Sequence, residues 1–146
     1  MIKISHRGNI KGPNKEYENN PAYITEALQK GYDVEVDVWM LEGSLFLGHD
    51  IAEYNINLDF LKNINLWCHC KNIESLSFLL NNNIRCFFHD KDKATLTSDG
   101  YIWTYPGMHL TSKSIYVMPE KNNWKTPIEI AGICSDFIDN IEEYIR

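Results

Sequence analysis

The chain has 146 residues and a formal net charge of −6 at pH 7; 44% of its residues are hydrophobic and 23% are charged. This composition is typical of one soluble globular domain with an apolar core. The negative net charge argues against electrostatic binding to nucleic acid. No apolar run approaches the roughly 18 residues of a membrane span, so stable membrane insertion is not expected.

The N-terminal stretch MIKISHRG has no apolar segment of the kind found in secretory signals. The spacing of Cys68, Cys70, Cys86 and Cys134 does not suggest a disulfide framework, which favours reduced thiols and a cytoplasmic protein. The stretch WCHCK also lacks the separated C-x-x-C pairs of structural zinc sites, so we do not predict zinc there.

Alternating side chains predict a first strand at 1–5 and a second at 33–40. In the second strand the valines at 34, 36 and 38 share one face, and Glu35 and Asp37 share the other. A strand at 44–50 is expected to pair back on it through a turn at 42–43. Further strands are predicted within 64–71, 83–90, 100–107, 114–120 and 130–136.

Three helices are predicted between these strands. In the first, Asn20 is a natural N-cap, Pro21 suits the first helical position and Gly31 suits the C-terminal cap. The expected apolar faces are Ile24, Ala27 and Leu28 in this helix, Ile73, Leu76 and Leu80 in 72–83, and Ile138, Ile141 and Ile145 in 136–146. The polar stretch 91–100 shows no helical pattern.

Strands interleaved with helices predict an α/β protein with a largely parallel sheet. A complete eightfold barrel needs about 200 to 250 residues, more than this chain has. We therefore predict a single domain, 1–146, built as a contracted or incomplete TIM-type (β/α) barrel with several helices reduced to loops.

Polar residues lie at the ends of the first strand and of the 44–50 strand, and on one face of the second strand and of the 64–71 strand. They are His6, Arg7, Glu35, Asp37, His49, Asp50, His69 and Lys71. Because the carboxyl ends of parallel strands converge on one site, these groups are expected to meet. Buried carboxylates, imidazoles and cations would be costly together without a metal ion or an anion to balance them.

The segments SHRG, ENN and GYDVEVDVWMLEGSLFLGHD resemble the glycerophosphodiester phosphodiesterases. That family has His-Arg-Gly, then Glu-Asn, then Glu-x-Asp, then Gly-x-x-x-(apolar)-x-His-Asp. Order and spacing agree over roughly the first fifty residues of this chain. Beyond them, GICSD resembles the last barrel strand of the family, and WCHCK lies at the place of its third-strand motif.

The resemblance implies a phosphoric diester hydrolase that acts on a small glycerophosphodiester-like substrate, in lipid metabolism. It implies that His6 and His49 are the acid/base pair and that Arg7 neutralises the phosphate. Glu35 and Asp37 would hold a divalent cation, Ca²⁺ or Mg²⁺, with Mn²⁺ possible. In the family the attacking group is often a hydroxyl of the substrate itself, which gives a cyclic phosphate that water then opens.

The third strand departs from the family. Where the family has a glutamate two residues before a lysine, this chain has His69 before Lys71, and histidine is a poorer ligand than a carboxylate for Ca²⁺ or Mg²⁺. The metal set is therefore expected to be completed either by His69 or by Glu120. Lys71 is predicted to contact the phosphate, and Trp103 is a candidate for stacking on a substrate ring.

Two alternatives remain open at this stage. One is a non-catalytic descendant that binds a phosphorylated ligand, and the other is a sphingomyelinase D-like lyase that acts on lipid phosphodiesters. The oligomeric state is also open. Several polar residues have a simpler explanation: we expect Glu18, Asn19 and Asp136 to cap helices, and His89, Asp90 and Asp92 to lie in a solvated loop. As a histidine at the end of a strand, His89 also has the alternative of lining the pocket.

Overall fold

The computed structural model describes residues 1–122 and 129–143, and its strands in that part of the chain form one ten-stranded sheet. Those strands are β1 (Ile2–His6), β2 (Asp33–Leu41), β3 (Ser44–Leu47), β4 (Tyr54–Ile56), β5 (Leu66–Cys70), β6 (Cys86–Phe87), β7 (Ala94–Leu96), β8 (Ile102–Thr104), β9 (Ser114–Val117) and β10 (Gly132–Ser135). The predicted strands are therefore confirmed, while β4 and β7 were not predicted.

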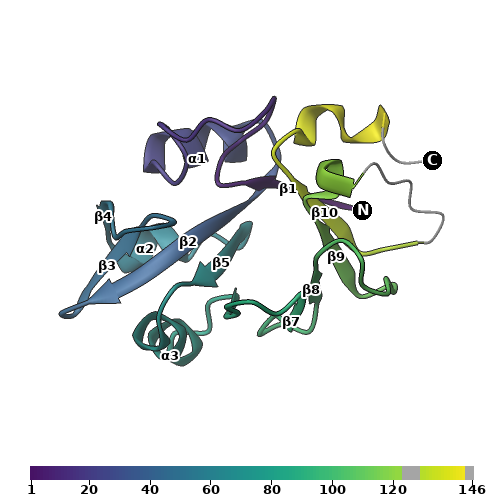
Figure 1. Ribbon diagram of the computed structural model, residues 1–146. Coiled ribbons are helices and arrows are strands. Elements are labelled where there is room, and N and C mark those ends of the chain that lie inside the picture. Colours follow the sequence, from purple (N-terminus) through teal and green to yellow (C-terminus); the bar gives the residue numbers. More distant parts are fainter. Residues whose placement is uncertain (123–128, 144–146) are drawn as a thin grey trace.

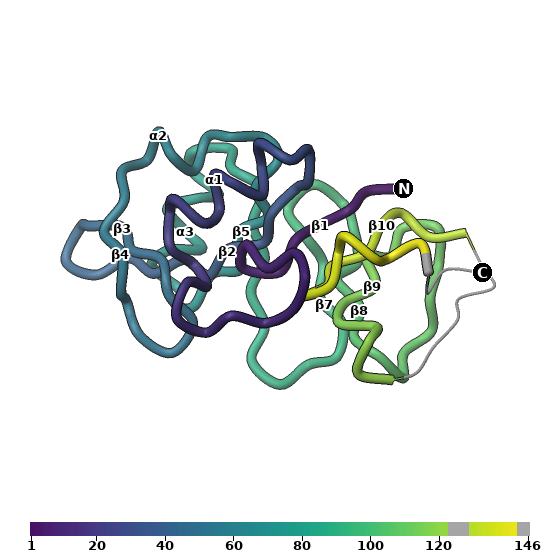
Figure 2. Tube along the Cα trace, turned by 90° about the horizontal axis from the view of Figure 1, so that it is seen from above, coloured from purple at the N-terminus to yellow at the C-terminus, as the bar shows by residue number. Residues whose placement is uncertain are grey.

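Most neighbouring strands are parallel. The parallel run is β6-β5-β2-β1-β10-β9-β8, and β3, β4 and β7 are attached to it by antiparallel pairing. β1 and β10 lie at the centre of Figure 1, with β2 to β4 on one side and β7 to β9 on the other. Seen from above in Figure 2, the purple-to-blue half of the chain and the green-to-yellow half meet at these two strands.

The expected fold class is correct in its coarse form: the protein is mixed α/β, with a curled half-barrel sheet and few helices. Within the described residues β6 pairs only with β5, so the sheet does not close into a complete barrel.

The first predicted helix is confirmed as α1 (Pro21–Gln29). The Asn20 side chain caps the N-terminus of the helix by accepting a hydrogen bond from the backbone N–H of Ala22. At the other end, Gly31 follows the C-cap residue Lys30 and has a φ of +89°. Ile24 and Ala27 are buried as expected. A short helix that was not predicted, α2 (Leu58–Leu61), follows β4.

The helix α3 (Ile73–Asn81) exists, but of its predicted face only Leu76 packs against the core. Ile73 and Leu80 are 62% and 48% exposed, whereas Ser75 and Leu79 are buried. The reason lies in β2, because the Ser75 hydroxyl donates to the Val38 carbonyl and turns this side of the helix toward the sheet.

The C-terminal segment is a 3-10 helix, η2 (Ile138–Glu143), rather than the predicted α-helix. Ile138 and Ile141 are buried, as the predicted face requires, and Ile145 lies outside the described residues. A second 3-10 helix, η1 (Pro119–Asn122), follows β9. None of the helices in the described part of the chain has the length and apolarity to cross a bilayer.

Two apolar clusters lie on the two faces of the sheet. The three valines of β2 pack with residues of α1 and α3, such as Ile24 and Leu79, which confirms that this face of β2 meets the helices. The opposite face carries an aromatic cluster that includes Trp67, Phe87 and Trp103. Since side chains alternate along each strand, Glu35 and Asp37 lie on this second face, toward the interior of the half-barrel.

Candidate active site

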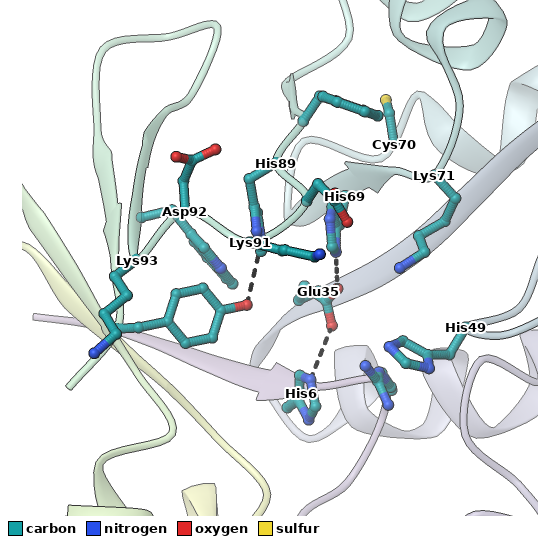
Figure 3. Close-up of a pocket in the computed structure, with 15 residues that line it drawn as sticks. His6, Glu35, His49, His69, Cys70, Lys71, His89, Lys91, Asp92 and Lys93 are labelled. Carbon is teal, nitrogen blue, oxygen red and sulfur yellow. Dashed lines mark hydrogen bonds and ion pairs between the residues drawn. The ribbon is translucent and has the colours of Figure 1, made fainter.

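A cavity of about 540 Å³ opens at the carboxyl edge of the parallel strands. Figure 3 shows its side chains around a central Glu35, with His6 below it and with His49 and Lys71 to one side. The lining residues are His6, Arg7, Glu35, His49, His69, Cys70, Lys71, Phe88, His89, Asp90, Lys91, Asp92, Lys93, Trp103 and Tyr105.

Glu35, Asp37 and His69 form a compact buried group at this cavity. One ligand atom from each lies within 4.8 Å of the others, and the three residues are only 2%, 0% and 8% exposed. The register of the sheet explains the grouping, because Asp37 is paired directly with His69 across β2 and β5. The Nδ1 atom of His69 lies 3.2 Å from Asp37 Oδ1 and 3.8 Å from Glu35 Oε1.

The two carboxylates titrate differently. Burial, followed by the negative charge of Asp37, raises the pKa of Glu35 to about 7. Burial alone would also raise the pKa of Asp37, but the side chains of His69 and Arg7 outweigh it and lower that pKa below its ordinary range. Asp37 is therefore the permanent anion of the pair, and Glu35 carries a proton about half of the time near neutral pH.

These residues fit a divalent cation. Glu35 Oε2, Asp37 Oδ1 and His69 Nε2 are buried and make no hydrogen bond within the described part of the chain. The two carboxylate atoms have only ion-pair contacts there, Asp37 Oδ1 with His69 Nδ1 and Glu35 Oε2 with His6 Nε2. Buried polar atoms are normally satisfied, and carboxylate and imidazole atoms without hydrogen bonds are ligands that divalent metal ions accept. The group is thus able to hold a metal ion, and nothing in it identifies which one.

Glu120, the other candidate ligand, lies outside this group. Its two carboxylate oxygens accept from the Ser135 hydroxyl at 2.9 Å and from the Asp136 backbone N–H at 3.0 Å. It therefore secures the end of β10, and among the two predicted candidates it is His69 that joins the carboxylates.

His6 lies at the end of β1, hydrogen-bonded through one ring nitrogen and within ion-pair distance of Glu35 through the other. Its Nδ1 is 2.7 Å from Asp136 Oδ1, and its Nε2 is 3.8 Å from Glu35 Oε2. Burial alone would lower the pKa of His6, but the hydrogen bond to Asp136 and the charge of Glu35 outweigh it and raise that pKa. The expectation that Asp136 caps the last helix is wrong, since its carboxylate orients His6.

Arg7 follows in a turn that needs the next residue to be glycine. Arg7 has a φ of +56° and Gly8 a φ of +93°, and a Cβ on Gly8 would lie 2.6 Å from the Tyr23 ring. The turn brings Arg7 Nε to 3.0 Å from Asp37 Oδ2 and Arg7 Nη1 to 3.4 Å from Glu18 Oε2. Arg7 is thus beside the group formed by Glu35, Asp37 and His69.

Glu18 and Asn19 do not cap the first helix, which corrects our expectation; Asn20 is the residue that does. Glu18 accepts from Asn9 Nδ2 at 3.0 Å and pairs with Arg7. Asn19 is 1% exposed and hydrogen-bonds Asp37 twice. The buried Asn9, which no sequence signal singled out, also donates to Asp136 at 2.8 Å.

His49 lines the same cavity but is more exposed, with 42% of its side chain accessible and Nδ1 2.8 Å from Asp50. Partial burial and the positive charge of Arg7 lower the pKa of His49. Gly48 allows this turn, because a Cβ there would clash with the Ile51 carbonyl. In Figure 3 Lys71 lies on the same side of Glu35 as His49.

The placement of Trp103 differs from the predicted stacking platform. It is only 1% exposed and packs against Trp67 and Phe87, and the centroid of its ring is 4.6 Å from that of Phe87. The aromatic stripe of β8 is therefore mainly core, and Trp103 contributes to the floor of the cavity without a free ring face.

His89 is a site residue that sequence reasoning placed in a solvated loop. Its ring stacks on His69 with 4.5 Å between centroids and 5° between planes, and its Nε2 is 3.2 Å from the Tyr105 hydroxyl. Burial, followed by the charges of His69 and Lys71, lowers the pKa of His89 to about 4. Its position at the end of the predicted strand 83–90, like that of His6 at the end of the first strand, was the signal that pointed to the cavity.

Comparison of the chain with protein-family models, with curated proteins and with solved structures finds no match. The case for a function is therefore made from this cavity and from the sequence motifs alone.

Proposed function

We propose that the protein is a metal-dependent phosphodiester hydrolase that cleaves a small glycerophosphodiester-like substrate by histidine acid/base catalysis. The observation that carries the proposal is the meeting of a buried Glu35, Asp37 and His69 group with His6 at one cavity. In this proposal the half-barrel is a contracted TIM-type barrel, whose carboxyl edge is where such folds carry their sites.

Glu35, Asp37 and His69 would hold the divalent ion, for which Ca²⁺, Mg²⁺ and Mn²⁺ are the candidates. Bound there, the ion would supply positive charge that stabilises a phosphoryl oxygen during cleavage. Arg7 adds a second positive charge beside Asp37. Its planar guanidinium is suited to phosphate oxygens, and Lys71 adds a point charge at the rim.

The two imidazoles suit opposite proton transfers. Asp136 favours the protonated form of His6, while Arg7 disfavours a proton on the more exposed His49. We therefore assign His49 as the base that takes a proton from the attacking hydroxyl, and His6 as the acid that protonates the departing alkoxide. One P–O bond forms, the P–O bond to the leaving group breaks, and each proton has a named acceptor.

Phosphorus-31 NMR tests the proposal. The protein is incubated with mixed glycerophosphodiesters, with Ca²⁺, Mg²⁺ or Mn²⁺ in turn or with a chelator. Monoester or cyclic-phosphate signals are expected with at least one ion and not with the chelator. They should be lost in His6→Ala and kept in His109→Ala, since His109 is exposed and does not line the cavity.

The same experiment separates the main alternative. If substrate signals broaden or shift on binding but no product appears with any ion, the protein is a phosphate-ligand binder and the catalytic proposal fails. Lipid phosphodiesters are added to the assay as a second set of substrates, and if cleavage occurs only with them, the lyase alternative replaces the glycerophosphodiester one.

A further inference from the structure

The segment between β6 and β7 forms part of one wall of the cavity and carries charges that the proposed chemistry does not use. Its residues Asp90, Lys91, Asp92 and Lys93 are exposed and line the cavity. Within the part of the chain that the structure describes, none of these four side chains forms an ion pair. The two ammonium groups are therefore free to meet an anion that enters the cavity.

Both ends of this segment are fixed to the site. Before it, the His89 ring stacks on the His69 ring, with 4.5 Å between their centroids. At its other end, the Lys93 carbonyl accepts from the Tyr105 backbone N–H at 2.8 Å. Lys91 follows His89 by two residues, which span at most about 7 Å. The long side chain of Lys91 is therefore within reach of His69 and of the carboxylates beside it.

The direction of its side chain distinguishes Lys91 from its neighbours in this segment. In Figure 3 the Lys91 side chain extends from the wall toward Glu35, and Lys71 reaches toward Glu35 from the other side. The side chains of Asp92 and Lys93 point away from Glu35 in the same view. Two ammonium groups, not only the one of Lys71, thus face the place where the phosphate would lie.

Cleavage needs more positive charge at the phosphate than binding does. A bound phosphodiester carries one negative charge. When the attacking hydroxyl gives its proton to His49 and bonds to phosphorus, the phosphoryl oxygens carry a second negative charge until the leaving group departs. A divalent ion would balance the two buried carboxylates, and Arg7 is already in ion pairs, so Lys71 matches the charge of the bound diester. A second lysine gains its partner only as the second charge develops.

We infer that Lys91 is a second phosphate-contacting lysine, whose ammonium group stabilises the negative charge that develops on the phosphoryl oxygens during cleavage. This inference rests on the proposed function and adds to it a residue that no sequence motif marks. Because the contact strengthens as charge develops, it should affect turnover more than substrate affinity. It should also favour binding of a phosphomonoester, which carries about two negative charges, over binding of a diester.

Steady-state kinetics with the diester that the wild type cleaves best tests the effect on turnover. Lys91→Gln should lower kcat by about tenfold or more and change KM by less than about threefold. The loss is expected to stay below the roughly 10² to 10³ of a buried donor, since water and salt screen an exposed charge. Lys91→Arg keeps the charge and should retain most of the activity. Lys113→Gln is the matched control, because Lys113 is exposed and does not line the cavity.

Calorimetric titration of two probes separates this role from a general attraction of anions. At about pH 8 glycerol phosphate carries two negative charges and dimethyl phosphate carries one. Both are titrated with Mg²⁺ or Mn²⁺ present. Lys91→Gln should weaken the binding of glycerol phosphate roughly two- to fivefold, the range of one exposed ion pair, and leave the binding of dimethyl phosphate nearly unchanged.

Three results would show only an effect of overall charge at the rim and would overturn the inference. They are an equal loss of affinity for both probes, a change in KM alone, and a loss of kcat in Lys93→Gln as large as in Lys91→Gln. Wild-type behaviour of Lys91→Gln overturns it as well, and in all these cases the phosphodiesterase proposal stands. If the wild type cleaves no diester with any ion, the inference and the proposed function fail together.

Discussion

The Asn19 side chain hydrogen-bonds both the side chain and the backbone of Asp37. Asn19 Nδ2 donates to Asp37 Oδ2 at 2.9 Å, and Asn19 Oδ1 accepts from the Asp37 backbone N–H at 2.9 Å. Asn19 itself has a φ of +65°, a conformation that asparagine tolerates better than most residues. The pair fixes a fully buried carboxylate in the orientation in which it meets His69 and Arg7.

Asn19→Gly removes both bonds without backbone strain, because glycine adopts positive φ readily. The free energy of unfolding should fall by about 1–3 kcal/mol, since a buried charged acceptor loses its donor. Urea denaturation measures this, with Asn83→Gly as the control: Asn83 is exposed and has a similar φ of +55°. Equal stability of the two variants would show that the Asn19 contacts contribute nothing.

Glu35 makes the stability of the metal-free protein depend on pH. Its pKa is raised to about 7 in the folded state, so between about pH 4.5 and 7 the folded state binds more protons than the unfolded state. Stability is therefore lost as pH rises through this window. As the pH rises from 4.5 to 8, the free energy of unfolding of the wild type should fall by about 3 kcal/mol more than that of Glu35→Gln. Urea unfolding with a chelator present measures both proteins, and parallel curves from pH 4.5 to 8 would contradict this assignment.

His69 should decide the preference of the site for different ions. Ca²⁺ and Mg²⁺ prefer oxygen ligands, whereas imidazole favours transition metals. His69→Glu should therefore tighten Ca²⁺ binding by roughly tenfold or more and weaken the relative preference for Mn²⁺. Calorimetry measures the affinities, and His109→Glu makes the same charge change away from the cavity. The ligand assignment is wrong if both variants bind these ions as the wild type does.

His6 and His49 should behave as one catalytic unit. Replacing either by alanine is expected to cut turnover by a factor on the order of 10² to 10⁴. The double variant should be far less than multiplicatively worse, because residues that act together are not additive. The rate should show a bell-shaped pH profile, measured with the phosphorus-31 assay. Full activity in His6→Ala would remove this residue from the chemistry.

The cysteines of β5 should matter for stability alone. Cys68 and Cys70 are fully buried among the apolar residues on the helix-covered face of the sheet. Cys70 borders the cavity, but its sulfur points away from Glu35 in Figure 3. The double variant Cys68→Ala/Cys70→Ala should lower the free energy of unfolding by about 1–3 kcal/mol and leave turnover unchanged. Loss of turnover in a folded double variant would instead give these thiols a role in the site.

Local patterns in the sequence account for the parts of the fold that were predicted correctly. The alternation in β2 put its valines on one face and Glu35 and Asp37 on the other, and the cap at Asn20 began α1. The α3 helix shows the limit of this reasoning. It has apolar residues on more than one side, and only its contact with β2 decides that Leu79 rather than Leu80 is buried.

The sequence by itself determined the first helix, the strand end that carries His6 and the strand faces that carry Glu35 and His69, because these follow from interactions between near neighbours in the chain. Only the tertiary structure decided which polar side chains touch. Asp136 reaches His6 from 130 residues away, and His89 joins Tyr105 across two strand ends. Such pairs depend on strand register and on the curl of the sheet, which bring distant residues together by packing and leave no periodic signal in the sequence.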